Sequence, residues 1–179
     1  MARHVVVGVA GAGAGKSTVS HQISQRMGIP HVELDALCWL ESWTKTPPEV
    51  FEADVRQAAA APSWVIDGNY GDAVRAITWG AADTIIWLDL SRRAVMRQLI
   101  VRTVRRKIGG TELWNGNKEK PVRDLLSRDR SRSILLWAWH TYQPTRSEYT
   151  QAMLDPRYAG GKLVRLSTHN QVKRYLRDL

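Results

Sequence analysis

A glycine-rich segment directly after an apolar run constrains this chain more than any other part of its sequence. Residues 4–10 read His-Val-Val-Val-Gly-Val-Ala, and residues 11–18 read Gly-Ala-Gly-Ala-Gly-Lys-Ser-Thr. Such a valine run is typical of a buried strand, and Val19, Ile23 and Met27 then recur at the four-residue spacing of a helix. When a glycine-rich turn joins a strand to a helix, the backbone N–H groups of the turn and the N-terminus of the helix face the same point. This arrangement predicts an anion-binding site.

Residues 10–18 match the Walker A pattern G-x-x-x-x-G-K-[ST], with Ala10 where the first glycine normally stands. In this pattern Lys16 places a positive charge between the phosphates of a nucleotide, and the Ser17 hydroxyl is a suitable ligand for Mg²⁺. We therefore expect ATP and Mg²⁺ to bind at this loop, rather than a turn that serves packing alone. The predicted nucleotide-binding residues are Gly11, Ala12, Gly13, Ala14, Gly15, Lys16, Ser17 and Thr18.

Apolar runs alternate with helical patterns along the whole chain. The expected strands are residues 4–10, 31–34, 64–66, 84–88 and 162–166. Helices are expected to begin near Ser17, Pro47, Ser91 and either Ser167 or Thr168, the third with an apolar stripe of Val95, Leu99, Ile100 and Val104. This alternation predicts an α/β fold, a parallel sheet with helices on both faces. At 179 residues without repeat or linker, we expect a single domain, 1–179.

Composition excludes several classes of protein. No apolar run approaches the roughly 18 residues needed to cross a bilayer, so we expect no membrane-spanning role. The single cysteine, Cys38, excludes an intrachain disulfide framework and any zinc site made of several cysteines. It also suits a reducing compartment, and we expect a cytoplasmic protein.

The net charge of +9 is confined to one stretch of the chain. Residues 91–132 hold 13 Lys or Arg against four acids, whereas the remainder holds 13 residues of each sign. Within this basic stretch, residues 109–121 contain three glycines, two asparagines and no apolar period, which predicts a mobile functional loop. A segment so basic is expected to face an anion, whether a nucleotide, a nucleic acid or an acidic partner.

Three expected strand ends carry an aspartate, and two of them could complete a magnesium site. Asp67 follows residues 64–66 and Asp89 follows residues 84–88. A carboxylate in that position can hold hydrated Mg²⁺ if its strand lies beside the strand before the glycine-rich loop. The third aspartate, Asp35, follows residues 31–34. Alternation alone does not say which strand is adjacent.

Several blocks of the sequence resemble one known family. The run Asp67-Gly-Asn-Tyr70 resembles the Asp-Gly segment of adenylate kinases. Together with residues 31–39, 86–90 and 112–117, it makes nearly the whole chain similar to adenylate-kinase-related P-loop proteins of the topology-modulation type. The resemblance implies a five-stranded parallel sheet of order 2-3-1-4-5, flanked by helices. It also implies an acceptor-binding insert at residues 36–62 and a lid region at residues 108–132.

The resemblance also implies roles for the three aspartates. In that strand order Asp67 lies next to the glycine-rich loop, so Ser17 and Asp67 are the expected metal ligands. Asp89 is then expected to belong to the N-cap region of the helix that begins after Ser91. Related shikimate and gluconate kinases use an acid near Asp35 to contact the acceptor hydroxyl or the hydrated metal. The alternative for Asp35 is a cap for the following helix.

Adenylate kinases carry two arginines, nine and thirteen residues after the strand-end acid, that line the phosphates. Counted from Asp89, Arg102 matches the second position, whereas Gln98 stands at the first. The neighbouring Arg97 is rotated by about 100° around the helix and does not inherit that role. Further lid arginines are expected among Arg123, Arg128, Arg130 and Arg132, and the predicted catalytic set is Lys16, Asp35, Arg102, Arg128 and Arg132.

These features predict an ATP-dependent phosphotransferase that transfers the γ-phosphoryl group to a small-molecule or nucleotide acceptor. The alternative is a regulatory P-loop NTPase that binds nucleic acid through its basic segment. The expected partners are ATP and a small acceptor, with nucleic acid less favoured, no membrane, and a monomer or homodimer. Trp39 and Trp43 are expected beside the acceptor pocket and Trp114 on the lid, with Trp137 and Trp139 packing a helix between lid and core.

Overall fold

The computed structural model describes residues 1–110, 112–118, 127, 129, 133–158 and 160–179. The strands are β1 (Arg3–Gly8), β2 (His31–Glu33), β3 (Trp64–Asp67), β4 (Thr84–Leu88) and β5 (Lys162–Leu166). The α-helices are α1 (Lys16–Met27), α2 (Leu34–Cys38), α3 (Pro48–Ala59), α4 (Asp72–Ala81), α5 (Arg92–Ile108), α7 (Ile134–Ala152) and α8 (His169–Arg177). Short 3₁₀ turns are η1 (Glu41–Trp43), η2 (Trp114–Gly116) and η3 (Pro156–Tyr158).

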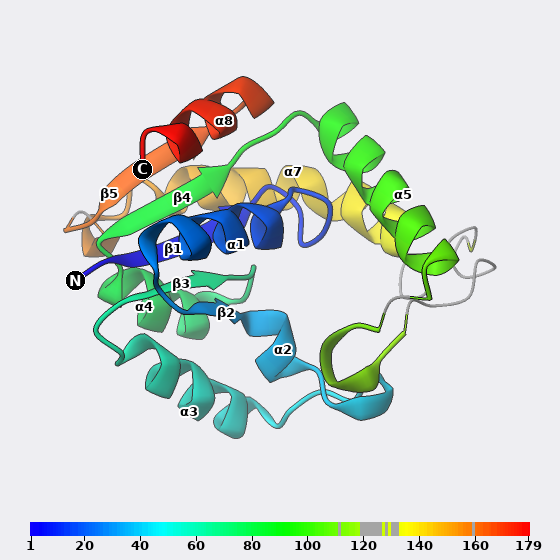
Figure 1. The fold of residues 1–179 in the computed structure, drawn as a ribbon, viewed down its shortest axis with the longest axis horizontal. Helices are drawn as coiled ribbons and strands as arrows, with labels where there is room; N and C mark the ends of the chain where they lie inside the picture. Colours follow the sequence, from blue (N-terminus) through cyan, green and yellow to red (C-terminus); the bar gives the residue numbers. More distant parts are fainter. Residues whose placement is uncertain (111, 119–126, 128, 130–132, 159) are drawn as a thin grey trace.

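The five strands form one parallel sheet in the order β2-β3-β1-β4-β5 (Figure 1). This confirms the expected α/β fold and strand order. β1 is the central strand, and its pairing with β3 sets Val6 opposite Asp67. Because parallel strands end at the same edge, the residues after β1, β2 and β3 are gathered there.

Alternate residues of β1 face opposite layers of helices. Val5 and Val7 lie in a buried cluster with side chains from α3, α4 and α7, whereas Val6 lies in a cluster with residues of α1 and α8. The valine run is therefore buried on both faces, as expected for the centre of a parallel sheet. In the described part of the chain, no helix is long and apolar enough to cross a membrane.

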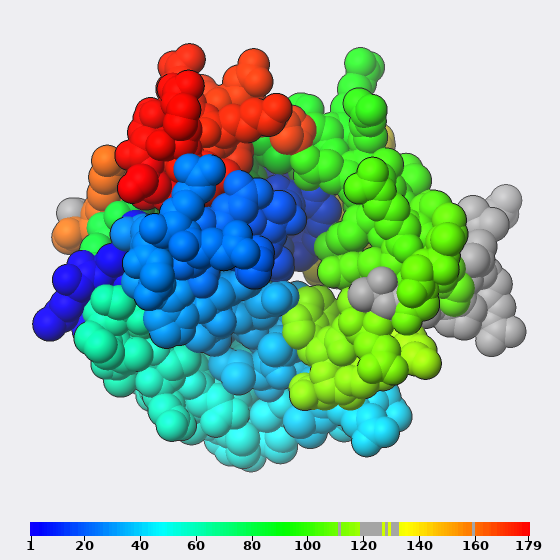
Figure 2. Space-filling model, viewed as in Figure 1, coloured from blue at the N-terminus to red at the C-terminus, as the bar shows by residue number. Residues whose placement is uncertain are grey.

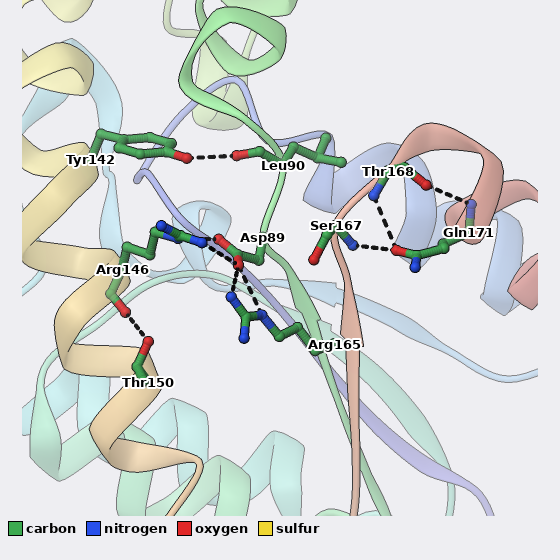
Figure 3. Close-up of polar contacts among 9 residues, drawn as sticks. All are labelled: Asp89, Leu90, Tyr142, Arg146, Thr150, Arg165, Ser167, Thr168 and Gln171. Atoms are coloured by element: carbon green, nitrogen blue, oxygen red, sulfur yellow. Dashed lines mark hydrogen bonds and ion pairs between the residues drawn. The ribbon is translucent and has the colours of Figure 1, made fainter.

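Helix boundaries follow local sequence signals in several places. α1 ends at Gly28, whose φ of 64° is the left-handed conformation that glycine adopts readily. α3 begins at Pro48, and Thr168 caps α8 in a capping box with Gln171 (Figure 3).

The structure differs from the sequence-based expectation at the buried face of α5 and at the end of β1. On α5, Val95, Leu99 and Thr103 are buried, whereas Ile100 and Val104 are 47% and 48% exposed. The first strand also ends two residues earlier than expected, at Gly8. The segment after Gly8 therefore belongs to the turn rather than to the sheet.

Asp89 does not cap the helix that follows it. Ser91 is the N-cap of α5 and accepts a hydrogen bond from the Ala94 backbone N–H. The Asp89 carboxylate is instead fully buried between two guanidinium groups, those of Arg146 on α7 and Arg165 on β5 (Figure 3). It therefore joins the ends of β4 and β5 to α7.

Candidate active site

The glycine-rich loop between β1 and α1 packs closely against α5 and α7. Gly13 has a φ of 85°, and a Cβ at this position would lie 2.9 Å from Cβ of Leu99. A Cβ on Gly11 would overlap the indole ring of Trp137. Gly13 therefore has to be glycine for its backbone conformation, and both positions need glycine because a Cβ would clash with a side chain of α5 or α7. The expected packing role of Trp137 takes the form of a direct contact with this loop.

Lys16 is the buried cation of the loop. Its side chain is 7% exposed, and its Nζ donates a 2.7 Å hydrogen bond to the Gly11 carbonyl oxygen. Burial lowers the pKa of Lys16 below its usual value, and the positive charge of Arg102 lowers it further. The carboxylates of Asp35, Asp67 and Glu33 act in the opposite direction. The ammonium group thus lies where three carboxylates and a second cation converge.

Ser17 and Asp67, the expected metal ligands, are adjacent. The Ser17 hydroxyl donates to Oδ1 of Asp67 at 3.3 Å, and Oδ2 of Asp67 lies 2.7 Å from Nε2 of His31. An open cleft of about 350 Å³ lies beside them, lined by Ser17, Thr18, His21, Gln22, His31 and Glu33. Two oxygen ligands at the edge of an open cleft suit Mg²⁺, which usually keeps several waters. Among the described residues, no group of three or more His, Cys, Asp or Glu could hold a metal by itself.

Asp35 lies in the first turn of α2, and its side chain does not cap that helix. The N-cap of α2 is Glu33, and Oδ1 of Asp35 accepts a 2.6 Å hydrogen bond from the Tyr70 hydroxyl. Of the three carboxylates, Asp35 has the largest effect on the Lys16 ammonium. The Asp35 carboxylate is therefore close enough to Lys16 to favour its charged form.

The predicted acceptor-binding insert and the predicted lid region contact each other through one hairpin each. Residues 39–45 and 112–118 each form a tight turn with one antiparallel bridge. We call their contact the clasp, and Figure 2 shows residues 112–118 lying against the earlier hairpin. The part of the predicted 109–121 loop that the structure describes at 112–118 is thus an ordered hairpin.

Asn117 and Trp114 supply most of the polar contacts of the clasp. Asn117 is 4% exposed, and its side-chain amide accepts a hydrogen bond from the backbone N–H of Trp43 and donates one to the Leu40 carbonyl oxygen. Trp114 donates its indole N–H to Oε2 of Glu33 at 3.0 Å, and its ring meets that of Trp43 edge-on. The clasp therefore reaches the edge of the sheet that carries the candidate metal ligands.

The predicted lid arginines have different outcomes. Arg102 is half-buried on α5 and is close enough to Lys16 to affect its pKa. Arg97 is exposed, whereas Gln98 lies near Gly15 and contacts His169. The two side chains point in different directions because neighbouring helix positions are rotated by about 100°. The remaining candidates lie outside the described residues: Arg123, Arg128, Arg130 and Arg132.

Sequence reasoning assigned no role to several residues that shape this site. Asn69 bonds both the N–H and the C=O of Gly8, at 3.1 and 2.6 Å, and so ties the end of β3 to the start of the loop. Tyr70 holds Asp35, and His31 holds Asp67. The available signal for Asn69 and Tyr70 was their position, two and three residues after the aspartate that ends β3.

Comparison with known proteins shows the fold alone. No protein-family model and no curated protein matches this sequence. A presumed kinase from Chloroflexus aurantiacus is 11% identical, with a TM-score of 0.50 over 99% of this chain and 96% of that chain. An unliganded sugar kinase from a Janibacter species is 16% identical, with a TM-score of 0.49 over 99% of this chain and 94% of that chain. The chain therefore shares the α/β architecture of the Chloroflexus protein.

Proposed function

We propose that this protein is an ATP-dependent phosphotransferase that transfers the γ-phosphoryl group of ATP to a small-molecule or nucleotide acceptor. The observation that carries the proposal is the arrangement of Lys16, Ser17 and Asp67 around the glycine-rich loop. The buried ammonium of Lys16 already bonds a carbonyl oxygen of that loop, which shows that it points back over it. A polyphosphate against the loop would offer Lys16 an anionic partner in place of the carbonyl.

Ser17 and Asp67 would hold Mg²⁺ with the nucleotide, the hydroxyl as a direct ligand and the carboxylate through water. Bound there, the ion would offset charge on the phosphate oxygens. The other oxygen of Asp67 is bonded by His31, which orients the carboxylate toward Ser17. Ser17 and Asp67 meet because β1 and β3 pair in parallel and end at the same edge of the sheet.

Arg102 and the clasp supply the features expected of a lid. Arg102 would stabilise negative charge on the phosphates, since its guanidinium stays ionised and binds oxygen atoms in pairs. Closure of the clasp would exclude water, which otherwise competes with the acceptor for the phosphoryl group. Arg128 and Arg132 remain predictions for the same role, because they lie outside the described residues.

Replacement of Lys16 tests the proposal. In Lys16→Ala we expect the affinity for Mg·ATP to fall about tenfold or more and ADP release to be lost, because the buried cation no longer faces the phosphates. The matched control is Lys162→Ala, an exposed lysine at the opposite end of the sheet. Affinity is measured by calorimetry and folding by circular dichroism. Unchanged affinity and unchanged turnover in a folded Lys16→Ala protein would refute a nucleotide role for the loop.

A further inference from the structure

Backbone strain is concentrated in the clasp. We call residues 39–45 the insert hairpin and residues 112–118 the lid hairpin. Among the described residues, those other than glycine with a positive φ are Ser42 at 58°, Trp43 at 56° and Asn115 at 54°. All of them lie in these two hairpins. Asparagine tolerates the left-handed region better than most residues, whereas a residue as bulky as tryptophan is unusual there. Such strain persists only where surrounding contacts hold it.

The lid hairpin holds the strained turn of the insert hairpin. The backbone N–H of Trp43 donates a 2.7 Å hydrogen bond to Oδ1 of Asn117. The indole N–H of Trp43 donates to the Lys118 carbonyl oxygen at 3.1 Å, and its ring meets that of Trp114 edge-on, with the centroids 6.5 Å apart. Most of the contacts that fix Trp43 therefore cross the clasp.

The insert holds the strained turn of the lid hairpin in the same way. Nδ2 of Asn115 donates to the carbonyl oxygen of Trp39 at 2.6 Å and to that of Ala36 at 3.2 Å. Each strained turn is thus fixed by hydrogen bonds to the other side of the clasp. When the hairpins separate, these bonds are lost and both turns are free to relax.

The two hairpins have the same backbone pattern. In each, one antiparallel bridge joins the first and seventh residues, and the N–H of the second residue bonds the C=O of the sixth. The fourth and fifth residues have a positive φ in both. At the fifth position the lid hairpin has Gly116, which adopts this conformation readily, whereas the insert hairpin has Trp43. The turn itself does not need a tryptophan, so Trp43 contributes contacts to the clasp and strain to its own hairpin.

The closed clasp is connected to the candidate active site through Glu33. The indole N–H of Trp114 donates to Oε2 of Glu33, which also lines the open cleft beside Ser17. Glu33 is one of the carboxylates that act to raise the pKa of Lys16. Opening of the clasp therefore removes a hydrogen bond from a residue that acts on the cation of the glycine-rich loop.

We propose that the clasp is a strained latch, in which the insert hairpin and the lid hairpin open and close together. Strain in the two turns opposes the bonds across the clasp, so the closed state is favoured less than those bonds alone would make it. A ligand that contacts only the closed state shifts the latch toward closure, and the strain helps the latch to reopen and release it. The latch is a property of the ligand-free protein, whereas its role in release rests on the proposed phosphotransferase function.

The strain is tested with Ser42→Gly, a change at an exposed position. Glycine adopts the left-handed conformation without penalty but also gives the open state more freedom, so we expect a modest gain in closure. Amide hydrogen exchange of the full, ligand-free chain should be about threefold slower in the insert hairpin and equally so in the unaltered lid hairpin. The matched control, Ser147→Gly at an exposed position of α7, should change neither hairpin. Unchanged or faster exchange in Ser42→Gly, or slowing confined to the insert hairpin, would overturn the latch.

A second variant tests the coupling from the other side. Asn115→Asp keeps the size of the side chain and removes the amide donor, and its carboxylate repels the carbonyl oxygens of Trp39 and Ala36. We expect exchange to be about tenfold faster or more in both hairpins, although the insert hairpin is unaltered. Faster exchange in the lid hairpin alone would mean that the two hairpins move independently, which contradicts the latch.

Release is tested by stopped-flow dissociation of a fluorescent, non-hydrolysable ATP analogue bound with Mg²⁺. Ser42→Gly should slow dissociation about threefold, and Asn115→Asp should accelerate it. Equal rates in both variants and the unaltered protein would overturn the role in release. Failure of the unaltered protein to bind the analogue would contradict the proposed phosphotransferase, whereas the exchange measurements use no nucleotide and still decide the latch.

Discussion

Two aspartates at the ends of the strands on either side of β1 should respond to the same substitution in opposite ways. Asp89→Asn should lower stability and spare turnover, because the Asp89 carboxylate is fully buried and is bonded by Arg146 and Arg165. Asp67→Asn should lower turnover and raise the magnesium requirement, because Asp67 lies beside Ser17 at the cleft. The pair thus tests whether the choice between these two carboxylates is right.

The magnitude for Asp89 follows from its burial and from the exposure of its partners. The Asp89 side chain is fully buried, whereas the side chains of Arg146 and Arg165 are 40% and 49% exposed. Hydrogen bonds to a charged group contribute about 1.5–3 kcal/mol each when desolvated, but half-exposed guanidinium groups recover much of this from water. Asparagine also keeps one acceptor oxygen. We therefore expect a loss of about 2 kcal/mol, which in a protein of this size is roughly 4–8 °C in Tm.

The assay combines thermal unfolding with ADP release at 25 °C across a magnesium titration. Arg146→Gln and Arg165→Gln are the controls, and each should cost less than Asp89→Asn because the other arginine still pairs with the carboxylate. Asp89→Asn together with Arg146→Gln should destabilise less than the sum of the two single changes, since both remove the same bonds. A Tm unchanged in Asp89→Asn, or turnover lower there than in Asp67→Asn, would refute the assignment.

Three further predictions concern other contacts. Gly11→Ala should weaken ATP binding roughly tenfold, because the new methyl overlaps the indole ring of Trp137. Adding Trp137→Ala should restore part of the ATP affinity, as measured by calorimetry, and no recovery would show that this overlap does not cause the loss. Asn117→Ala removes a buried amide that bridges the clasp, so the free energy needed to open the clasp should fall by about 2 kcal/mol. Amide hydrogen exchange over residues 112–118 should then be faster, and unchanged exchange would show that the clasp does not open as a unit. Burial lowers the pKa of His4, so the folded state binds fewer protons than the unfolded state and stability should fall as the pH drops below about 6.5. His4→Gln should reduce the difference between urea midpoints at pH 8 and pH 5, and an undiminished difference would assign the effect to other groups.

The sequence by itself determined the features that depend on neighbouring residues. The valine run specified a strand buried on both faces, Gly28 ended α1, and Pro48 began α3, each through a local conformational preference. The glycine-rich loop was recognisable because its pattern is contiguous. The strand order came from the resemblance of longer blocks and was confirmed in the sheet.

Only the tertiary structure decided which side chains meet. Asp67 and Asp89 are both strand-end aspartates, yet one faces Ser17 and the other is enclosed by arginines 57 and 76 residues further along the chain. Tyr70 likewise bonds a carboxylate 35 residues away. The physical reason is that local preferences set the conformation of a segment, whereas the surroundings of a side chain depend on which strands become neighbours and which helices cover them. The connections between strands bring together residues that are far apart in the sequence, and no local sequence pattern predicts such contacts.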